Sequence, residues 1–498
     1  MMLKYTNYNR NCQKLFMLFL KKISFFILPF FFLLVNNCTD LSTTLDPSDS
    51  ASSSPSLNYS VSISGNHQDS IHFSLISNGY SDFILPYHFF DNPVHETDSQ
   101  LVTHLKITDI AGHTIRFTSN KIAIGPVNNK VIHLDGTVYQ PVTISYRINA
   151  AALNADKTIG QNAFSITDST VSFLGNAAFI IPFTTSELVP LWRNKHKISV
   201  DIICKSSIPL YGVTSSGSYT CDNIYELLFS QIYAGKRPII EGYGGGTRFA
   251  FINFSQSEIS IDSARVIGQR FSGILDAVWK TYGAFNNDLL TVAFSSIGGG
   301  LEGTFSFTQL PPPNTKFYYI LAHEALHQFV GIRCGEYDDP WWKEGGTSYL
   351  SYLIAVRQEQ YPKDEFRKSI TTHFSYGDST GFNVALSDQW LRANMFPENR
   401  FSIVYDKGAQ VMMLLDYATR SASDNRYSIE DVSSYLVNRF DGGAFHRSDF
   451  LNAFTKFGNP DISNIFKTYV DTAGQHPSDS LLSFTFNKLD SLGAFGSY

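Results

Sequence analysis

Charged residues and cysteines are scarce in this chain of 498 residues. Only 16% of the residues are Asp, Glu, Lys or Arg, and the formal net charge is −6, whereas roughly 25% of the residues in an average soluble protein are charged. A nucleic-acid-binding protein needs a basic surface that displaces counterions, so this balance argues against nucleic acid as a partner. The five cysteines include no CxxC pair, which excludes a cysteine-ligated zinc or iron–sulfur site.

The apolar run nearest the N-terminus, residues 23–35, is too short as a helix to span a hydrocarbon core of about 30 Å. It follows a basic start without Asp or Glu, which is typical of a secretory signal, and we predict such a signal over residues 1–37. Cys38 and the polar tether over 38–56 resemble a bacterial lipoprotein processing site, although Asn37 replaces the usual small residue. We therefore expect export to the periplasm or cell surface and a lipid anchor to the membrane on Cys38. An ordinary signal with an incidental cysteine is the alternative.

Aromatic residues are abundant, at 14% of the chain, and they indicate a folded globular protein. Residues 57–225 consist of short alternating runs between turn residues, which predicts an N-terminal β-sandwich-like domain. Residues 226–498 form a second domain, with a small sheet followed by a helical C-terminal half. Its expected elements are a helix over Asp262–Tyr282 with Val266 and Phe271 on its inner side, strands near 289–294 and 304–308, and helices near 316–331, 343–361, 403–420, 428–440, 447–457 and 461–470.

Cys204 and Cys221 flank a turn-rich segment of the first domain. In an oxidising compartment these two cysteines could form a disulfide. Two buried thiols are the alternative.

The motif His323-Glu324-Ala-Leu-His327 lies within a helical pattern. Residues four apart on a helix differ by about 40° around its axis, so both imidazoles point to one ion. Glu324 projects to the side and can reach a water without being a ligand, which is the arrangement of zinc peptidases. A chance match on an ordinary helix is the alternative.

A third ligand is available at Glu344, with sixteen residues between it and the motif, on a second helix with Asp339 as its candidate cap. A carboxylate returned by that helix would complete a His₂Glu site for one Zn²⁺ per chain and leave one position for water. Ser348, one turn later, could form a hydrogen bond to one of the metal-ligating side chains without contacting the metal itself. Alternatively, Glu344 is a first-turn acid favoured by the helix dipole. We expect Trp341 and Trp342 to pack rather than to contact substrate.

Together, HExxH, Glu344-Gly-Gly-Thr-Ser-Tyr, Tyr405-Asp-Lys-Gly-Ala and Gly299-Gly-Leu-Glu302 resemble the glycyl aminopeptidase family of zinc metallopeptidases. These enzymes are gluzincins related to aminopeptidase N, and the resemblance implies a thermolysin-like catalytic domain. It assigns zinc binding to His323, His327 and Glu344 and catalysis to Glu324 as general base, with Tyr405 as the donor to the oxyanion. Gly300 and Glu302 would bind the substrate, Glu302 by its free α-ammonium group. The implied partners are peptides with N-terminal Gly- or Ala-like residues.

This chain departs from the family pattern at several positions. Gly346 stands where the family has Phe, and Gly303 replaces the histidine after the acidic residue. We expect no PDZ-type partner module, because the chain ends soon after its last helices. A zinc endopeptidase or a broader aminopeptidase on the same fold is therefore an alternative, and so is a non-catalytic surface-binding protein that retains the fold.

Overall fold

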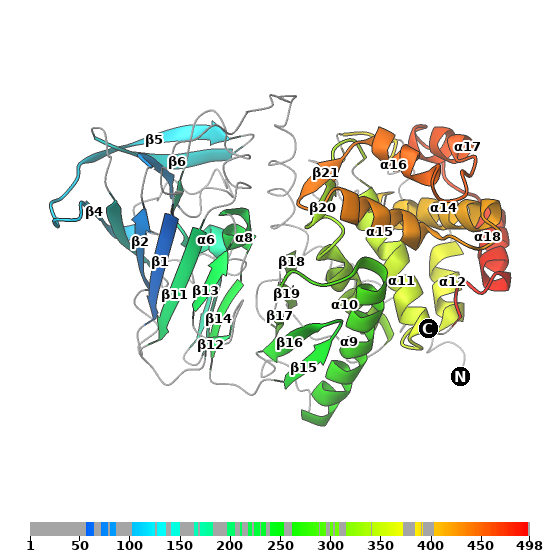
Figure 1. Cartoon of the computed structure of the whole chain (residues 1–498), viewed down its shortest axis with the longest axis horizontal. Coiled ribbons are helices and arrows are strands. Elements are labelled where there is room, and N and C mark those ends of the chain that lie inside the picture. The colour runs from blue at the N-terminus through cyan, green and yellow to red at the C-terminus, as the bar shows by residue number, and fades with distance from the viewer. Residues whose placement is uncertain are drawn as a thin grey trace, which may run out of the picture.

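The chain forms an N-terminal group of β-sheets and a C-terminal α/β region in the computed structural model (Figure 1). The structure describes residues 56–63, 71–77, 80–85, 102–124, 127–135, 141–149, 164–167, 170–182, 197–204, 210–211, 218–221, 224–229, 231–235, 240–252, 261–287, 289–294, 299–301, 304–307, 315–339, 341–371, 384–389, 391 and 403–496. The predicted signal and tether, including Cys38, lie outside these residues. No helix among the described residues is long and apolar enough to cross a membrane.

Three sheets build the N-terminal region. The first has the strand order β13-β11-β1-β2-β7-β4, formed by Ser218–Cys221, Lys197–Cys204, Ser56–Ile63, Ile71–Ser77, Val142–Ile148 and Val102–Thr108. The second has the order β10-β3-β6-β5, formed by Ile181–Pro182, Asp82–Ile84, Val127–Leu134 and Phe117–Ile124. The third has the order β12-β14-β9-β8, formed by Leu210–Tyr211, Gln231–Gly235, Thr170–Leu174 and Phe164–Thr167. The predicted β-rich character of this region is confirmed.

Buried and more exposed side chains alternate along the strands, and the buried ones form the core of this region. In β2 and β7 every second side chain is buried, as expected for a sheet with one covered face. Phe73 stacks on Tyr146 at 5.1 Å between ring centroids and meets Phe179 edge-on at 5.8 Å. The Tyr146 hydroxyl donates to the carbonyl of Ala178, at the end of the short helix α6 (Gly175–Ala178), so the buried phenol is satisfied.

The register of the first sheet rules out the disulfide considered between Cys204 and Cys221. Strands β11 and β13 pair antiparallel with Cys221 opposite Ile198, six residues from Cys204 along the strand. Six residues of extended chain separate the two Cα atoms by about 20 Å, and a disulfide requires less than about 7 Å. The third sheet also extends past the expected domain boundary at residue 225, because β14 pairs with β9.

The C-terminal region starts with a five-stranded mixed sheet of order β15-β16-β17-β19-β18, formed by Ile240–Gly244, Thr247–Ile252, Leu289–Phe294, Thr304–Phe307 and Gly299–Leu301. Helix α9 (Ile261–Tyr282) packs on this sheet through Phe271, which meets Phe249 edge-on at 5.1 Å. The predicted helix and both strands are therefore confirmed. Val266 is 45% exposed and Ile267 is fully buried, so the placement of Val266 on the inner side was wrong.

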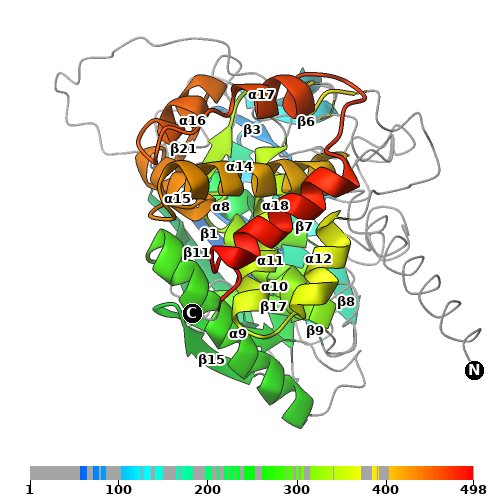
Figure 2. The same ribbon diagram turned by 90° about the vertical axis from the view of Figure 1, so that its right-hand side faces the viewer.

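Helices form the rest of this region, and a further strand pair, β20 with β21, adds Cys334–Glu336 and Gly443–Phe445. The helices are α8 (Ile224–Phe229, beside the N-terminal sheets), α10 (Thr315–His327), α11 (Thr347–Arg357), α12 (Lys363–Thr371), α14 (Gly408–Ala422), α15 (Ile429–Arg439), α16 (Arg447–Phe454), α17 (Ser463–Ile465) and α18 (Asp479–Ser491). Among the described residues, three π-helical turns also occur: η2 (Trp342–Gly346), η4 (Ile403–Lys407) and η5 (Phe466–Val470). Figure 2 shows α14, α15 and α18 covering the face away from the N-terminal sheets.

Candidate metal centre

Helix α10 brings the two motif histidines together. Nε2 of His323 lies 3.0 Å from Nε2 of His327, and both residues are 7% exposed. The rest of the helix is anchored by apolar residues such as Phe317, Leu321 and Leu326, all fully buried. A helix held rigidly on its other faces fixes the direction in which the two imidazoles point. The prediction that both imidazoles point to one position is confirmed.

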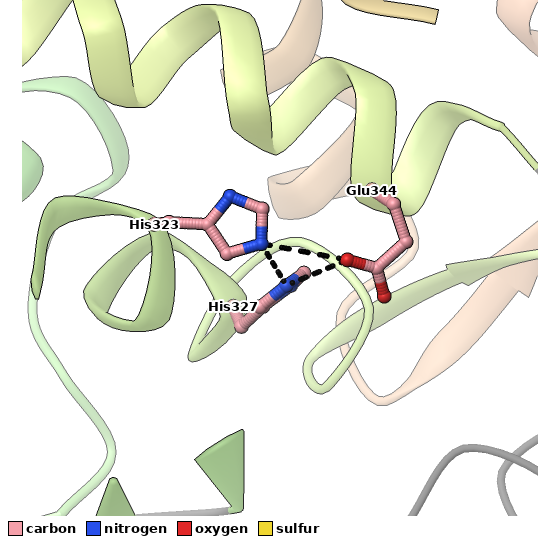
Figure 3. A group of neighbouring side chains, drawn as sticks. All are labelled: His323, His327 and Glu344. Atoms are coloured by element: carbon pink, nitrogen blue, oxygen red, sulfur yellow. Dashed lines mark hydrogen bonds and ion pairs between the residues drawn. The ribbon is translucent and has the colours of Figure 1, made fainter. Parts of the chain in front are cut away.

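Glu344 enters the same space from the π-helical turn η2 (Figure 3). Its Oε2 lies 3.2 Å from Nε2 of His327 and 3.4 Å from Nε2 of His323, and the residue is 1% exposed. One ligand atom from each residue lies within 4.8 Å of the others, and this is the only such group among the described residues. Glu344 is therefore part of a cluster rather than a free first-turn acid.

The chemistry of these donors fits a zinc ion. His327 Nδ1 lies 3.0 Å from the carbonyl oxygen of Val330, so this nitrogen carries the proton and the Nε2 lone pair faces the cluster. Two imidazole nitrogens and a carboxylate oxygen, without an intervening cation, would present lone pairs to one another. Two His ligands and one Glu form the ligand set of catalytic zinc sites, which keep a fourth position open.

Glu324 lies beside the cluster without belonging to it. The pKa of Glu324 is raised to about 7, chiefly by burial. The charge of Glu344 contributes to this increase, and His323 and Lys343 oppose it. A carboxylate with a pKa near neutrality is suited to accept and return a proton. The structure thus places Glu324 where a general base is expected.

Tyr405 completes the centre from the turn η4. Its ring stacks on that of His323, with centroids 5.9 Å apart and planes 19° from parallel. Burial raises the pKa of Tyr405 well above its usual value, and the charges of Glu344 and Glu324 add to the shift. The hydroxyl therefore keeps its proton and can donate a hydrogen bond. Tyr405 and Glu344 are 61 positions apart, and the fold brings them together as the motif predicted.

Two glycines, Gly345 and Gly408, allow the turns that contain Glu344 and Tyr405 to approach each other closely. A Cβ atom on Gly345 would lie 2.6 Å from Cα of Gly408 and 2.6 Å from the carbonyl oxygen of Val404. The backbones of η2 and of the η4–α14 junction are therefore in direct contact. Gly346 is different, because the Cε of Met412 and the ring of Trp342 fill the space beside it. Those side chains occupy the space beside the position where the family has Phe.

Two predictions about the second helix were wrong. Asp339 does not cap it, because the carboxylate accepts two hydrogen bonds from the Arg447 guanidinium, at 2.6 and 2.8 Å. Trp341 precedes the turn without a side-chain cap. The Ser348 hydroxyl is buried and makes no hydrogen bond to any of the three ligand side chains. Trp341 and Trp342 are buried, in agreement with the packing role expected for them.

Lys343 is a residue that the sequence analysis missed. It is 8% exposed, and its Nζ lies 3.7 Å from Oε1 of Glu344. The signal was a lysine set between two tryptophans and a Glu-Gly-Gly run, a context in which a charged side chain has no obvious route to solvent.

Of the two predicted substrate-binding residues, Gly300 lies within the described part of the chain. Gly300 lies in the edge strand β18, and this strand lies close to α10. Glu302 lies outside the described residues, so its role stays a prediction.

The comparisons with known proteins agree with this geometry. Residues 313–469 match the family model of the peptidase family M1 domain. These residues are therefore similar to a peptidase family M1 domain. The match includes the three cluster residues, Glu324 and Tyr405, and it supports the resemblance to the gluzincins related to aminopeptidase N.

Solved structures share the fold of this chain at low sequence identity. An aminopeptidase N family protein from Idiomarina loihiensis is 14% identical, with a TM-score of 0.64 over 84% of this chain and 76% of that one. Leukotriene A4 hydrolase from Saccharomyces cerevisiae is 15% identical, with a TM-score of 0.50 over 85% and 68%. The yeast enzyme in complex with bestatin is 14% identical, with a TM-score of 0.50 over 87% and 71%. No curated protein matches the sequence.

Proposed function

We propose that this chain is an exported zinc aminopeptidase that removes small N-terminal residues, such as Gly or Ala, from peptides. The observation that carries the proposal is the convergence of His323, His327 and Glu344, with Glu324 and Tyr405 beside them. The M1 domain supports peptidase chemistry, and the motif around Glu302 supports cleavage at a free N-terminus.

The residues of the centre divide the work of peptide hydrolysis. His323, His327 and Glu344 would hold the zinc, which supplies a Lewis acid for the scissile carbonyl and for the attacking water. Glu324 accepts the proton of that water and returns it to the leaving amine. The Tyr405 hydroxyl donates a hydrogen bond to the oxygen on which negative charge develops, and its high pKa keeps the donor proton in place.

Recognition of the N-terminus is the step that separates an aminopeptidase from an endopeptidase. An ammonium group bound by Glu302 would fix the substrate so that only the first peptide bond reaches the centre. Acetylation removes that charge. A panel of aminoacyl fluorogenic substrates, including Gly and Ala, should therefore be cleaved with a free amine and spared when N-acetylated. Cleavage of both forms at similar rates would contradict the aminopeptidase proposal and favour an endopeptidase on the same fold.

Two controls sharpen this experiment. The Glu302→Gln variant should lose the preference for free amines while keeping its zinc, because the substitution leaves His323, His327 and Glu344 unchanged. Bestatin, which the yeast enzyme binds in a solved structure, should inhibit cleavage of the free substrates. Normal discrimination in Glu302→Gln would show that another group binds the amine.

A further inference from the structure

Lys343 combines burial with a charge directed at the centre. The residue precedes Glu344 in the turn η2, and its side chain is 10% exposed. Transfer of an ammonium group out of water is costly unless an opposite charge compensates for it. One such charge is Oε1 of Glu344, 3.7 Å from Nζ, and the Glu344 side chain is itself only 2% exposed. The pair is therefore a buried one inside the wall of the metal centre.

The path of the lysine side chain is fixed by the turn that follows α10. Gly331 has a φ of +99°, and a Cβ on it would lie 2.6 to 2.8 Å from Cε, Cγ and Cδ of Lys343. The aliphatic stem thus lies flat against the Gly331 backbone, where no side chain intervenes. This same turn contains Val330, whose carbonyl orients His327. The ammonium group is consequently held in place by the loop that also orients a ligand.

The two oxygens of Glu344 face different partners. Oε2 lies against both histidine nitrogens, at 3.2 and 3.4 Å, whereas Oε1 is the oxygen nearest to Lys343. We propose that Lys343 is a positioning residue that reserves Oε1 for its ammonium group, so that Glu344 offers only Oε2 to the metal. The inference rests on the proposed zinc centre and adds how the third ligand is presented.

This arrangement has a consequence for metal affinity. Groups behind a ligand that increase its basicity strengthen metal binding, and their loss typically costs about 10- to 100-fold in affinity. An ammonium group acts in the opposite sense, because it draws charge from the carboxylate and repels the dication. Lys343 therefore weakens zinc binding while keeping the carboxylate on one oxygen and a coordination position open for substrate.

The test is the zinc affinity of the full chain with Lys343→Met, a change that keeps a stem over Gly331 and removes the charge. Competition with a chromophoric chelator should show zinc bound at least about tenfold more tightly than in the wild type. Lys343→Arg, which restores the charge, should return the affinity to the wild-type range. A merely structural role would produce the opposite result, a loss of affinity without rescue by arginine.

Controls separate this inference from the proposed function. Lys363→Met removes a lysine that pairs with Asp490 at the surface, at 2.9 Å, and should leave zinc affinity unchanged. Lys343→Gln, a second neutral variant, should behave like Lys343→Met and serves if the methionine variant does not fold. Unchanged or weaker zinc binding in the neutral variants, with normal binding in the wild type, would overturn the inference alone. A wild-type protein that binds no zinc would overturn both proposals.

Discussion

Glu324 and Glu344 are neighbours in space with different tasks, and their surroundings account for the difference. Glu344 has its Oε2 against two histidine nitrogens, which with Lys343 hold its pKa well below the usual value despite burial. Glu324 has no such set of partners, and burial raises its pKa to about 7. Two carboxylates with pKa values displaced in opposite directions are typical of a permanent ligand beside a proton carrier.

Replacement of Glu324 by Gln tests this division at the scale of one residue. The variant keeps all three clustered ligands, so its zinc content should equal that of the wild type. Hydrolysis of aminoacyl substrates should fall by about 10²- to 10⁴-fold, because the amide cannot accept the proton. Normal turnover by the variant would show that another group is the base.

Asp406, next to Tyr405, is a second acid with a displaced pKa. Burial raises the pKa of Asp406 from 3.8 to about 8. An acid whose pKa is higher in the folded than in the unfolded chain binds more protons when folded. Its contribution to stability is therefore fully present below about pH 4 and is lost as the pH rises towards 8.

Asp406→Asn removes this dependence. We compare the free energies of unfolding of the metal-free proteins. The difference between variant and wild type should shift in favour of the variant by about 1–2 kcal/mol from pH 5 to pH 8. This effect is smaller than the full pKa shift would give, because Asp406 is partly exposed. Urea unfolding at the two pH values measures the gain. A difference between the two proteins that is the same at both pH values would contradict the assignment.

Two helices of the metal centre begin with a π-helical turn, and each of these turns contains a residue of the candidate site. Glu344 lies in η2 before α11, and Tyr405 lies in η4 before α14. Turns of this kind are rare and often occur at functional sites, because the extra residue redirects the side chains. Contact between Gly345 and Gly408 locks the two turns together.

The contact between Gly345 and Gly408 can be tested by comparing alanine variants of Gly345 and of its neighbour Gly346. Gly345→Ala should push η2 away from η4, since its Cβ would meet backbone atoms at 2.6 Å, and should cost about 1–3 kcal/mol of stability together with zinc binding. Gly346→Ala is the matched control, because its Cβ would meet side chains alone, at the ordinary contact distances of 3.4 Å to the flexible end of Met412 and 3.6 Å to the Trp342 ring. Thermal unfolding and zinc content report both effects. Equal behaviour of the two variants would show that the close approach is unimportant.

Buried charges fasten the outer helices to these elements. Asp416 is fully buried and accepts hydrogen bonds from the Tyr349 hydroxyl at 2.7 Å and from Arg420 at 3.0 Å. Arg357 of α11 pairs with Glu430 of α15 at 2.8 Å and also donates to the carbonyl of Ala494 near the C-terminus. The network joins α11, α14 and α15, so the helix that follows Glu344 is held on its outer side as well.

Local patterns predicted many elements of this chain and failed where distant segments decide the outcome. The apolar period of α9 and that of the helix expected near 428–440, which is α15, are properties of consecutive residues, and both helices are present. Helices α12 and α18 were not predicted. Only Phe366 and Ile370 are buried in α12, so its periodic signal is weak.

The site shows the same contrast. The His323–His327 geometry follows from helical spacing alone. Glu344 was predicted from its position on a second helix after the motif, and Tyr405 was predicted from the motif resemblance. Lys343 was not found, because its role depends on the turn at Gly331, and Asp339 was misread because its partner Arg447 lies 108 positions away. The rejected disulfide depended on the register of β11 with β13, which the cysteine spacing does not contain.

At the scale of the whole molecule, a β-rich N-terminal region precedes the catalytic domain (Figure 1). We infer from the sequence that the protein is exported and anchored at a membrane by a lipid on Cys38. Two acyl chains or more hold a protein stably at a bilayer, whereas the described residues contain no helix suited to cross one.

Cys38→Ser tests the anchor. In a bacterial host that processes lipoproteins, the wild-type enzyme should sediment with membranes and require detergent for extraction. The serine variant should lose the lipid and move to the soluble exported fraction or retain its uncleaved signal. Mass spectrometry of the N-terminal peptide distinguishes these forms. An identical distribution of both proteins, with an unmodified Cys38, would favour an ordinary secretory signal.

The proposed function requires His323, His327 and Glu344 to form a zinc site. The direct test is the metal content of the purified full chain after zinc reconstitution and removal of loosely bound ions. We predict one zinc per chain in the wild type and a loss of that zinc when His327 is replaced by Ala. Less than about one bound zinc per chain in the wild type, even after reconstitution, would contradict the claim and leave only a binding protein that retains the peptidase fold.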